Sequence, residues 1–168
     1  AAKLKKFYST FVNAVKLAEI EHGIPNESWE WKRCSDKESC MYVFNNYLAN
    51  HFSYSKITYG SDVYSTIGFV EEPVFAVYLN DGTIMSCSGS ESNIFYIDVN
   101  GEKGPNQAGR DIFGFYIGSS TEIVIEEDIS RDEIIASAKN STLDAVFKGF
   151  QLIMKDGWEI KDDYPYRL

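Results

Sequence analysis

The stretch Val74-Phe-Ala-Val-Tyr-Leu-Asn80-Asp81-Gly82-Thr-Ile-Met-Ser-Cys-Ser88 decides the fold class of this chain. Its two halves, 74–79 and 83–88, have the β-prone composition that suits a pleated sheet. The Asn-Asp-Gly triplet between them tolerates positive φ, so the stretch predicts a tight antiparallel hairpin. Further strands, bounded by Gly, Asn or Ser, are expected at 94–99, 111–118 and 122–126. Together they predict an antiparallel β-meander of about four to five strands.

Helical patterns flank this sheet on both sides. Residues 1–22 place apolar side chains at helical spacing, and Gly23 and Pro25 predict that the helix ends near His22. A capping box at Ser35 predicts a second helix that ends near Phe52. The segment 53–73 is expected to be predominantly loop, with room for one short strand. A second capping box at Ser130 and an apolar pattern over 142–154 predict C-terminal helices. The predicted fold class is therefore α+β.

Length and charge restrict the organisation of the chain. A chain of 168 residues suits a single domain with one core. Its parts are a helical stem (1–22), a helix-loop region (23–73), an antiparallel sheet (74–128) and a C-terminal helix and tail (129–168). The formal net charge of −9 argues against nucleic acid as a partner. The sequence holds no run of about 18 apolar residues, the length that a membrane-spanning helix needs.

The three cysteines allow one disulfide and one remaining thiol. Cys34 and Cys40 are the natural pair, whereas Cys87 is expected to be a small buried side chain of the hairpin. A zinc site built from Cys34, Cys40 and His51 is the alternative, but it lacks a fourth ligand. The sequence therefore favours a disulfide between Cys34 and Cys40.

One segment, 98–111, concentrates oxygen donors and turn-forming residues. Asp98, Asn100 and Glu102 alternate as calcium ligands do, and Asp111 is placed to close the ring from the next strand. Asp98, Asn100 and Asp111 are therefore calcium candidates. The alternative, which we favour, is a long folded turn whose side chains bond to the backbone, since Asn, Gly and Pro explain the turn without a metal.

No catalytic residue is expected, and the chain is interpreted as a non-enzyme. Two histidines give little material for a triad, and the sequence has no phosphate loop or nucleophile elbow. The adjacent carboxylates Glu71-Glu72 and Glu126-Glu127-Asp128 would point to opposite faces of a strand, unlike a glycosidase pair. A small hydrolase that uses Glu71 or Asp111 is the lowest-ranked interpretation.

Three segments taken together resemble a known family. They are Lys3-Leu-Lys-Lys-Phe-Tyr-Ser-Thr-Phe followed by Leu17-Ala-Glu-Ile-Glu-His-Gly23, then Tyr96-Ile-Asp-Val-Asn-Gly-Glu-Lys-Gly-Pro-Asn-Gln-Ala-Gly-Arg-Asp-Ile-Phe-Gly-Phe115, and Asp156-Gly-Trp-Glu-Ile-Lys-Asp-Asp-Tyr-Pro165. In this order they are similar to the type IV pilins and the pseudopilins of type II secretion. The central loop and the tail carry the specific part of the likeness.

The resemblance implies a structural subunit of an extracytoplasmic filament, at the cell surface or in the periplasm. Its expected partners are other pilin or pseudopilin subunits. The chain would be a soluble headpiece without the N-terminal membrane helix, through which the full-length form is anchored in the inner or cytoplasmic membrane. The missing C-terminal cysteine loop favours a pseudopilin or minor pilin. Some pseudopilins bind calcium in a comparable loop.

The first helix would be the assembly element of such a subunit. Its apolar residues are Leu4, Phe7, Tyr8, Phe11 and Val15. Phe7, Phe11 and Val15 are expected to face the head, whereas Leu4, Tyr8 and Leu17 are expected to remain available to neighbouring subunits. The alternative function is a secreted carbohydrate- or ligand-binding module that uses exposed aromatic side chains. Its candidates are Trp29, Trp31, Trp158 and the tyrosines at 54, 59 and 64.

Overall fold

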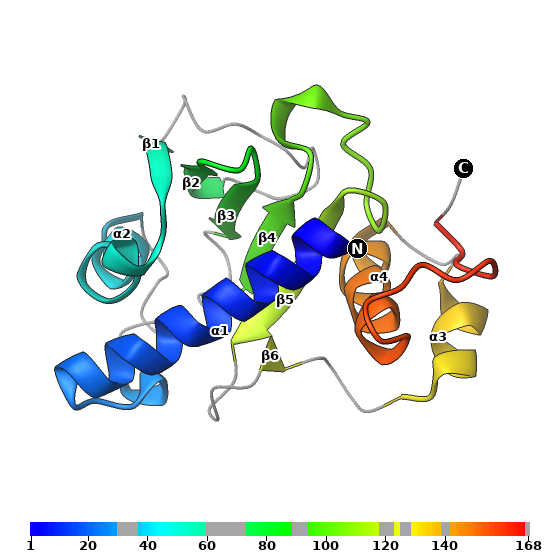
Figure 1. Cartoon of the computed structure of the whole chain (residues 1–168), viewed down its shortest axis with the longest axis horizontal. Helices are drawn as coiled ribbons and strands as arrows, with labels where there is room; N and C mark the ends of the chain where they lie inside the picture. The colour runs from blue at the N-terminus through cyan, green and yellow to red at the C-terminus, as the bar shows by residue number, and fades with distance from the viewer. Residues whose placement is uncertain are drawn as a thin grey trace.

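The computed structural model describes residues 1–29, 37–59, 73–88, 94–117, 123–124, 129–138 and 142–166. The fold is α+β, as the hydrophobic patterns predict (Figure 1). Its α-helices are α1 (Ala2–His22), α2 (Lys37–Val43), α3 (Arg131–Ser137) and α4 (Thr142–Lys155). A π-helical turn, Phe44–Leu48, and a 3-10 turn, Ala49–His51, continue directly from α2.

The strands form one antiparallel sheet in sequence order. They are β1 (Tyr54–Tyr59), β2 (Pro73–Leu79), β3 (Ile84–Ser88), β4 (Ile94–Asp98), β5 (Ile112–Ile117) and β6 (Ile123–Val124). The meander is confirmed, but the expected number of about four to five strands is too low, because the described residues form six strands in this sheet. β1 adds an edge by pairing with β2, and β6 is a two-residue strand.

The β2–β3 hairpin forms as its turn residues predict. Gly82 has a φ of 84°, a conformation that glycine adopts without steric cost. The amide of Leu79 donates to the carbonyl of Thr83, and the Asp81 side chain accepts a hydrogen bond from the Thr83 amide. These local bonds set a register in which Tyr78 pairs with Ile84 and Val77 with Met85.

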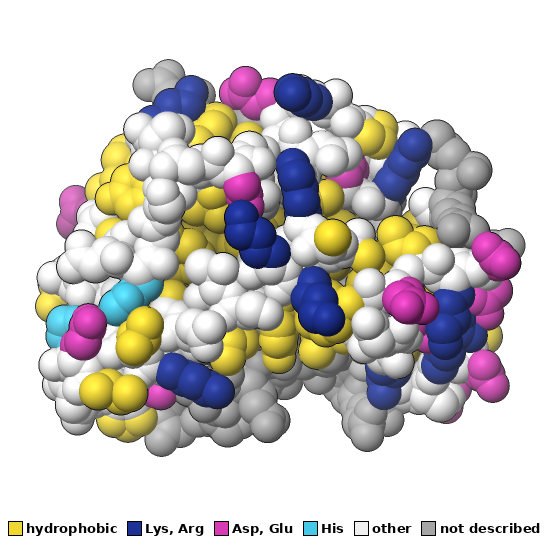
Figure 2. All heavy atoms as spheres, viewed as in Figure 1, with side chains coloured by type: hydrophobic (Ala, Val, Ile, Leu, Met, Phe, Trp, Pro, Cys, Tyr) yellow, Lys and Arg dark blue, Asp and Glu magenta, His cyan; other side chains and the backbone are white. Residues whose placement is uncertain are grey.

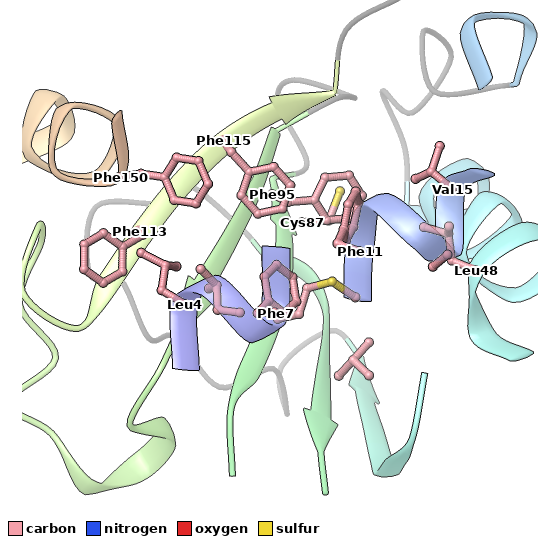
Figure 3. Packing of buried hydrophobic residues seen from close by; sticks show 14 of the residues in the cluster. Leu4, Phe7, Phe11, Val15, Leu48, Cys87, Phe95, Phe113, Phe115 and Phe150 are labelled. Atoms are coloured by element: carbon pink, nitrogen blue, oxygen red, sulfur yellow. The ribbon is translucent and has the colours of Figure 1, made fainter. Parts of the chain in front are cut away.

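Helix α1 lies across one face of the sheet and buries a single stripe there (Figure 1). Phe7 and Phe11 contact the sheet through Phe95 and Phe115, with a centroid distance of 5.1 Å between Phe11 and Phe115 (Figure 3). The helix ends at His22 as predicted. Gly23 follows in the left-handed conformation, and its amide donates to the carbonyl of Glu19. Burial of this aromatic stripe is the main reason for the helix to dock on the sheet.

The C-terminal helices close the other side of the core. Ser130 and Glu133 form the predicted capping box of α3. Phe150 of α4 joins the cluster beneath α1 (Figure 3), whereas Val146 packs with Tyr96 and Ile112 in a second cluster. Helix α4 therefore contributes side chains to both clusters and packs mainly against β5. No helix among the described residues is both long and apolar enough to cross a bilayer.

Candidate functional site

Asp98 closes β4 and begins the loop that the sequence singles out. Its Oδ1 accepts hydrogen bonds from the amides of Asn100 and Gly101, both at 2.9 Å. Its Oδ2 is buried and accepts no hydrogen bond from the described residues. Burial, together with the nearby carboxylate of Asp111, raises the pKa of Asp98 to about 6.

Asp111 lies at the other end of the loop and organises it. Its Oδ1 accepts a hydrogen bond from the amide of Gln107 at 2.6 Å, and its Oδ2 accepts one from the amide of Asn106 at 2.8 Å. The side-chain nitrogen of Asn100 also donates to Asp111 Oδ2, at 3.4 Å. The structure therefore brings Asp98, Asn100 and Asp111 together, as the sequence predicts.

The loop's donor set does not fit calcium in this arrangement. Calcium takes six to eight oxygen ligands, whereas Asp111 uses both carboxylate oxygens, and Asp98 uses one, to accept backbone N–H groups. Asn100 turns its side-chain nitrogen toward Asp111 and so acts as a donor. Across the residues that the structure describes, no group of three or more His, Cys, Asp or Glu side chains is arranged to hold a metal. The contacts observed are those of the folded turn that we favour.

The first turn of α1 is joined to this loop. The side-chain nitrogen of Lys3 donates to the carbonyl oxygen of Val99 at 3.1 Å. The charge of Lys3 partly offsets the rise in the pKa of Asp98. The hydrogen bond from Lys3 links the first turn of α1 to the residue that follows β4.

The predicted assembly residues of α1 lie in the protein's own core. Leu4, Phe7, Phe11 and Val15 are all buried. Tyr8 is half-buried, and its ring lies 5.0 Å from that of Trp158 in the C-terminal tail. The expectation that Leu4 is available to a neighbouring subunit is therefore wrong, because Leu4 lies on the same buried stripe as Phe7 and Phe11.

Other side chains of α1 are exposed. Leu17 is 48% exposed and Ile20 is 77% exposed, and Ile24, just beyond the helix, is 40% exposed. Availability is predicted from the sequence for Leu17, but Ile20 is counted there with the apolar residues of the docking face, and the exposure of Ile20 shows that this assignment is wrong. The signal that identifies Ile20 is the helical spacing itself, which places it opposite the Phe7, Phe11 and Ala18 stripe.

The predicted cysteine pair lies outside the described residues, since neither Cys34 nor the side chain of Cys40 is described. Cys87 is buried on β3 beneath α1 (Figure 3), the environment that the sequence predicts. Of the two proposed hydrolase carboxylates, Glu71 also lies outside the described residues, and Asp111 accepts the backbone N–H groups of its own loop.

The aromatic candidates for ligand binding that the structure describes do not form one exposed surface. Trp29 is buried and stacks on Tyr47 at a centroid distance of 4.4 Å. Trp158 packs against Tyr8 and Phe150, and Tyr59 is half-buried. Tyr54 is exposed, whereas Trp31 and Tyr64 are outside the described residues. Trp29 and Trp158 are therefore core anchors.

A cleft of about 460 Å³ lies between α1, the turn before β1 and the β2–β3 hairpin. Phe7, Phe52 and Leu79 form its apolar part. The polar lining is Lys6, Thr10, His51, Ser53, Asn80 and Asp81. Lys6 and Asp81 form an ion pair of 3.2 Å, and His51 Nε2 lies 3.2 Å from Glu21 Oε2. The sequence does not predict this cleft, because its residues come from three distant segments.

Comparison with known proteins gives one family match. Residues 1–128 match the model of a family of unknown function, DUF6613. The matched region covers α1, α2, the whole sheet and the Asp98–Asp111 loop, and it ends before α3. No curated protein matches the chain, and no solved structure does.

Proposed function

The chain belongs to DUF6613, a family of unknown function, and we propose that it is a structural subunit of an extracytoplasmic filament. The resemblance of its stem, central loop and tail to type IV pilins and pseudopilins supports this class. So does the arrangement of one N-terminal helix on an antiparallel meander (Figure 1). The proposed subunit acts by packing against its neighbours at the cell surface or in the periplasm, and not by catalysis.

One observation carries this proposal. Helix α1 docks its Phe7, Phe11 and Ala18 stripe on the sheet and exposes Leu17 and Ile20 on another side. Ile20 is 77% exposed. A neighbouring subunit that covers it removes apolar surface from water, which favours association. A helix that is apolar on more than one side suits a subunit whose partners pack along it.

The experiment uses the complete gene product in its own cells. Filaments sheared from the cells are counted by electron microscopy for the wild type, Ile20→Lys and Ile20→Leu. Ile20→Lys should remove most filaments, because a charge cannot be buried at the contact without a partner. Ile20→Leu should assemble normally, since it keeps the apolar surface.

A matched control and a direct contact measurement complete this test. Tyr54→Lys introduces the same charge at another exposed apolar position, on the edge strand β1, and should leave assembly unchanged. A photo-crosslinking residue at position 20 should join two copies. Normal assembly of Ile20→Lys, or the absence of any filament from the wild type, would overturn the proposal.

The cleft favours a second candidate, a module that binds a small polar ligand. Two of its three apolar lining residues are aromatic, and its rim offers the hydroxyls of Thr10 and Ser53 and the amide of Asn80. Such a combination suits a sugar-like molecule. Titration of monosaccharides followed by NMR should shift signals of Phe52 and Asn80, and unchanged spectra would remove this candidate.

A further inference from the structure

The positive charges of α1 stand out in an acidic protein. The first sixteen residues hold four lysines and no acidic residue, whereas the whole chain has a net charge of −9. The remaining residues therefore carry −13, which is −9 minus the four positive charges. Lys3, Lys5 and Lys6 also stand near the positive end of the helix dipole, where cations are unfavourable. The stability of the isolated helix therefore does not explain why these lysines lie in α1.

Among the described residues, the side chains of two of the four lysines have partners and those of the other two have none. Lys3 bonds to Val99, and Lys6 pairs with Asp81. Lys5 and Lys16 are exposed, and neither side chain forms an ion pair or hydrogen bond with the described part of the chain. They are eleven residues apart, which is about three helical turns, so they lie on the same outer face of α1.

The acidic counterpart lies at α3 and the C-terminal tail. Arg131 binds both Asp156 and Asp163, and so holds the start of α3 beside the tail. Asp132 follows Arg131 in the sequence, and Glu159 lies between Asp156 and Asp163. Both residues are exposed, and neither forms an ion pair among the residues that the structure describes. Figure 2 shows lysine and arginine side chains over α1, and acidic side chains interspersed with basic ones at the edge of the molecule that holds α3 and the tail.

We propose that the outer face of α1, marked by Lys5 and Lys16, docks on the surface marked by Asp132 and Glu159 in a second copy of this chain. The inference rests on the proposed filament function and names the contact between its subunits. Charge complementarity between the two surfaces supports a second copy as the partner. An anionic membrane or a nucleic acid would instead be repelled by the −13 carried outside the start of α1.

The placement of the two surfaces determines the kind of assembly. The basic face lies on α1, and the acidic face lies on different elements at another side of the molecule (Figure 1). A contact between two different surfaces of identical copies is heterologous, so a docked pair still has one free basic surface and one free acidic surface. Such contacts generate rings or open helical filaments, and the open form is the one that the proposed function requires.

Charge reversal tests this contact. One variant carries Lys5→Glu and Lys16→Glu, and a second carries Asp132→Lys and Glu159→Lys. Each purified alone should associate about tenfold more weakly than the wild type at low salt, because like charges then face each other. Mixing the two variants should restore association, since each one then offers the surface that the other has lost. Sedimentation velocity measures association, and circular dichroism checks folding.

A crosslinking experiment identifies the contact directly. A carbodiimide, which joins lysine to carboxylate without a spacer, is applied to a mixture of ¹⁴N- and ¹⁵N-labelled chains. Mixed-isotope crosslinks should join Lys5 or Lys16 to Asp132 or Glu159. Lys103→Glu, a reversal at an exposed lysine of the central loop, is the matched control and should change neither crosslinks nor association.

The outcomes separate this contact from the filament function itself. Equal filament assembly by the wild type and the Lys5→Glu, Lys16→Glu variant would overturn the contact and leave the filament function standing. Failure of the mixed variants to recover association would also overturn the contact. Lysine-dependent binding of the chain to phosphatidylserine vesicles, without mixed-isotope crosslinks, would assign the basic face to a membrane instead. A wild type that forms no filaments would overturn the filament function.

Discussion

Arg131 holds Asp156 through two parallel contacts, Nε to Oδ1 at 2.6 Å and Nη2 to Oδ2 at 3.1 Å. The same guanidinium reaches both carboxylate oxygens of Asp163. The carboxylate of Asp156 is only 1% exposed, so it depends on this partner and on Lys161 at 3.0 Å. One arginine at the start of α3 thus joins the end of α4 to the C-terminal tail.

Replacement of Arg131 should weaken the contact between α3, the end of α4 and the C-terminal tail, and so destabilise the protein. Arg131→Gln leaves the buried carboxylate of Asp156 with one fewer cation, so the urea midpoint of unfolding should fall. Asp163→Asn should have a smaller effect because Asp163 is 53% exposed. Arg110→Gln is the control, since Arg110 bonds only to Gln107 among the interactions that the described residues show, and it should leave the midpoint nearly unchanged.

The effect of Arg131→Gln should depend on pH. In the wild type, the hydrogen bonds that Arg131 donates lower the pKa of Asp156 in the folded protein. A lowered carboxyl pKa contributes stability above the ordinary value, near 3.9, and this contribution is lost as the pH falls through the folded pKa. The difference between the wild type and Arg131→Gln should therefore shrink below about pH 3. A difference that stays constant to pH 2 would contradict this explanation.

Asp98 should give the opposite pH dependence. Its pKa is raised to about 6, chiefly by burial, so the folded protein favours the protonated carboxyl. This stability is complete below the ordinary pKa and is lost as the pH rises through 6. The free energy of unfolding should fall by up to about 3 kcal/mol between pH 4 and pH 7.

Urea unfolding at pH 4, 5, 6 and 7 measures the effect of Asp98. In Asp98→Asn the decline should disappear, because the amide does not ionise. Asp132→Asn, at an exposed carboxylate, should keep the wild-type profile. A wild type that becomes more stable from pH 4 to pH 7, by the same amount in Asp98→Asn, would show that other groups dominate this range.

Phe11 should be among the residues whose truncation destabilises the fold most. It is buried beneath α1 and contacts Phe7, Phe52, Phe95 and Phe115. Phe11→Ala should lower the free energy of unfolding by about 3–5 kcal/mol through lost burial and a cavity. Asn13→Ala, on the exposed side of the same helix, should change it by less than about 0.5 kcal/mol. Similar values for the two variants would contradict the observed docking of α1.

Substitutions at two glycines that have the same φ distinguish the cost of backbone strain from the cost of steric crowding around a new side chain. Gly109 and Gly157 both have a φ of 74°. A Cβ on Gly109 would lie 2.7 Å from the ring of Tyr166 and 2.9 Å from the carbonyl of Ala145, whereas a Cβ on Gly157 would meet nothing within 4 Å. Gly157→Ala should cost about 1–2 kcal/mol for its backbone angle. Gly109→Ala should cost at least about 1 kcal/mol more, measured by urea unfolding, and equal costs would contradict close packing of the tail.

Local patterns predicted much of the fold because their causes are local. The Asn80–Gly82 turn, the Gly23 cap of α1 and the Ser130 capping box each depend on residues within about four positions. The strand β1 is harder to predict because the polar pattern of Tyr54–Tyr59 resembles a loop. It becomes a strand by pairing with β2, and that partner lies about twenty residues away.

The candidate site was also predictable only in part. The sequence predicts that Asp98, Asn100 and Asp111 belong to one loop, since they lie between two recognisable strands. It does not predict which carboxylate oxygens accept backbone N–H groups, and therefore leaves calcium open. The position of Leu4 also depends on tertiary packing, because amphipathicity defines a stripe but not its width.

From its sequence alone, this chain is an α+β protein with a capped N-terminal helix, a central hairpin and an acidic character. These features follow from hydrophobic periodicity, turn chemistry and charge, all of which act over short separations. Only the tertiary structure decided that Leu4 is buried and Ile20 exposed, that Trp29 and Trp158 are core anchors, and that Arg131 joins α3 to the tail. Those outcomes depend on which distant surfaces meet, and burial is shared among segments that no local pattern connects.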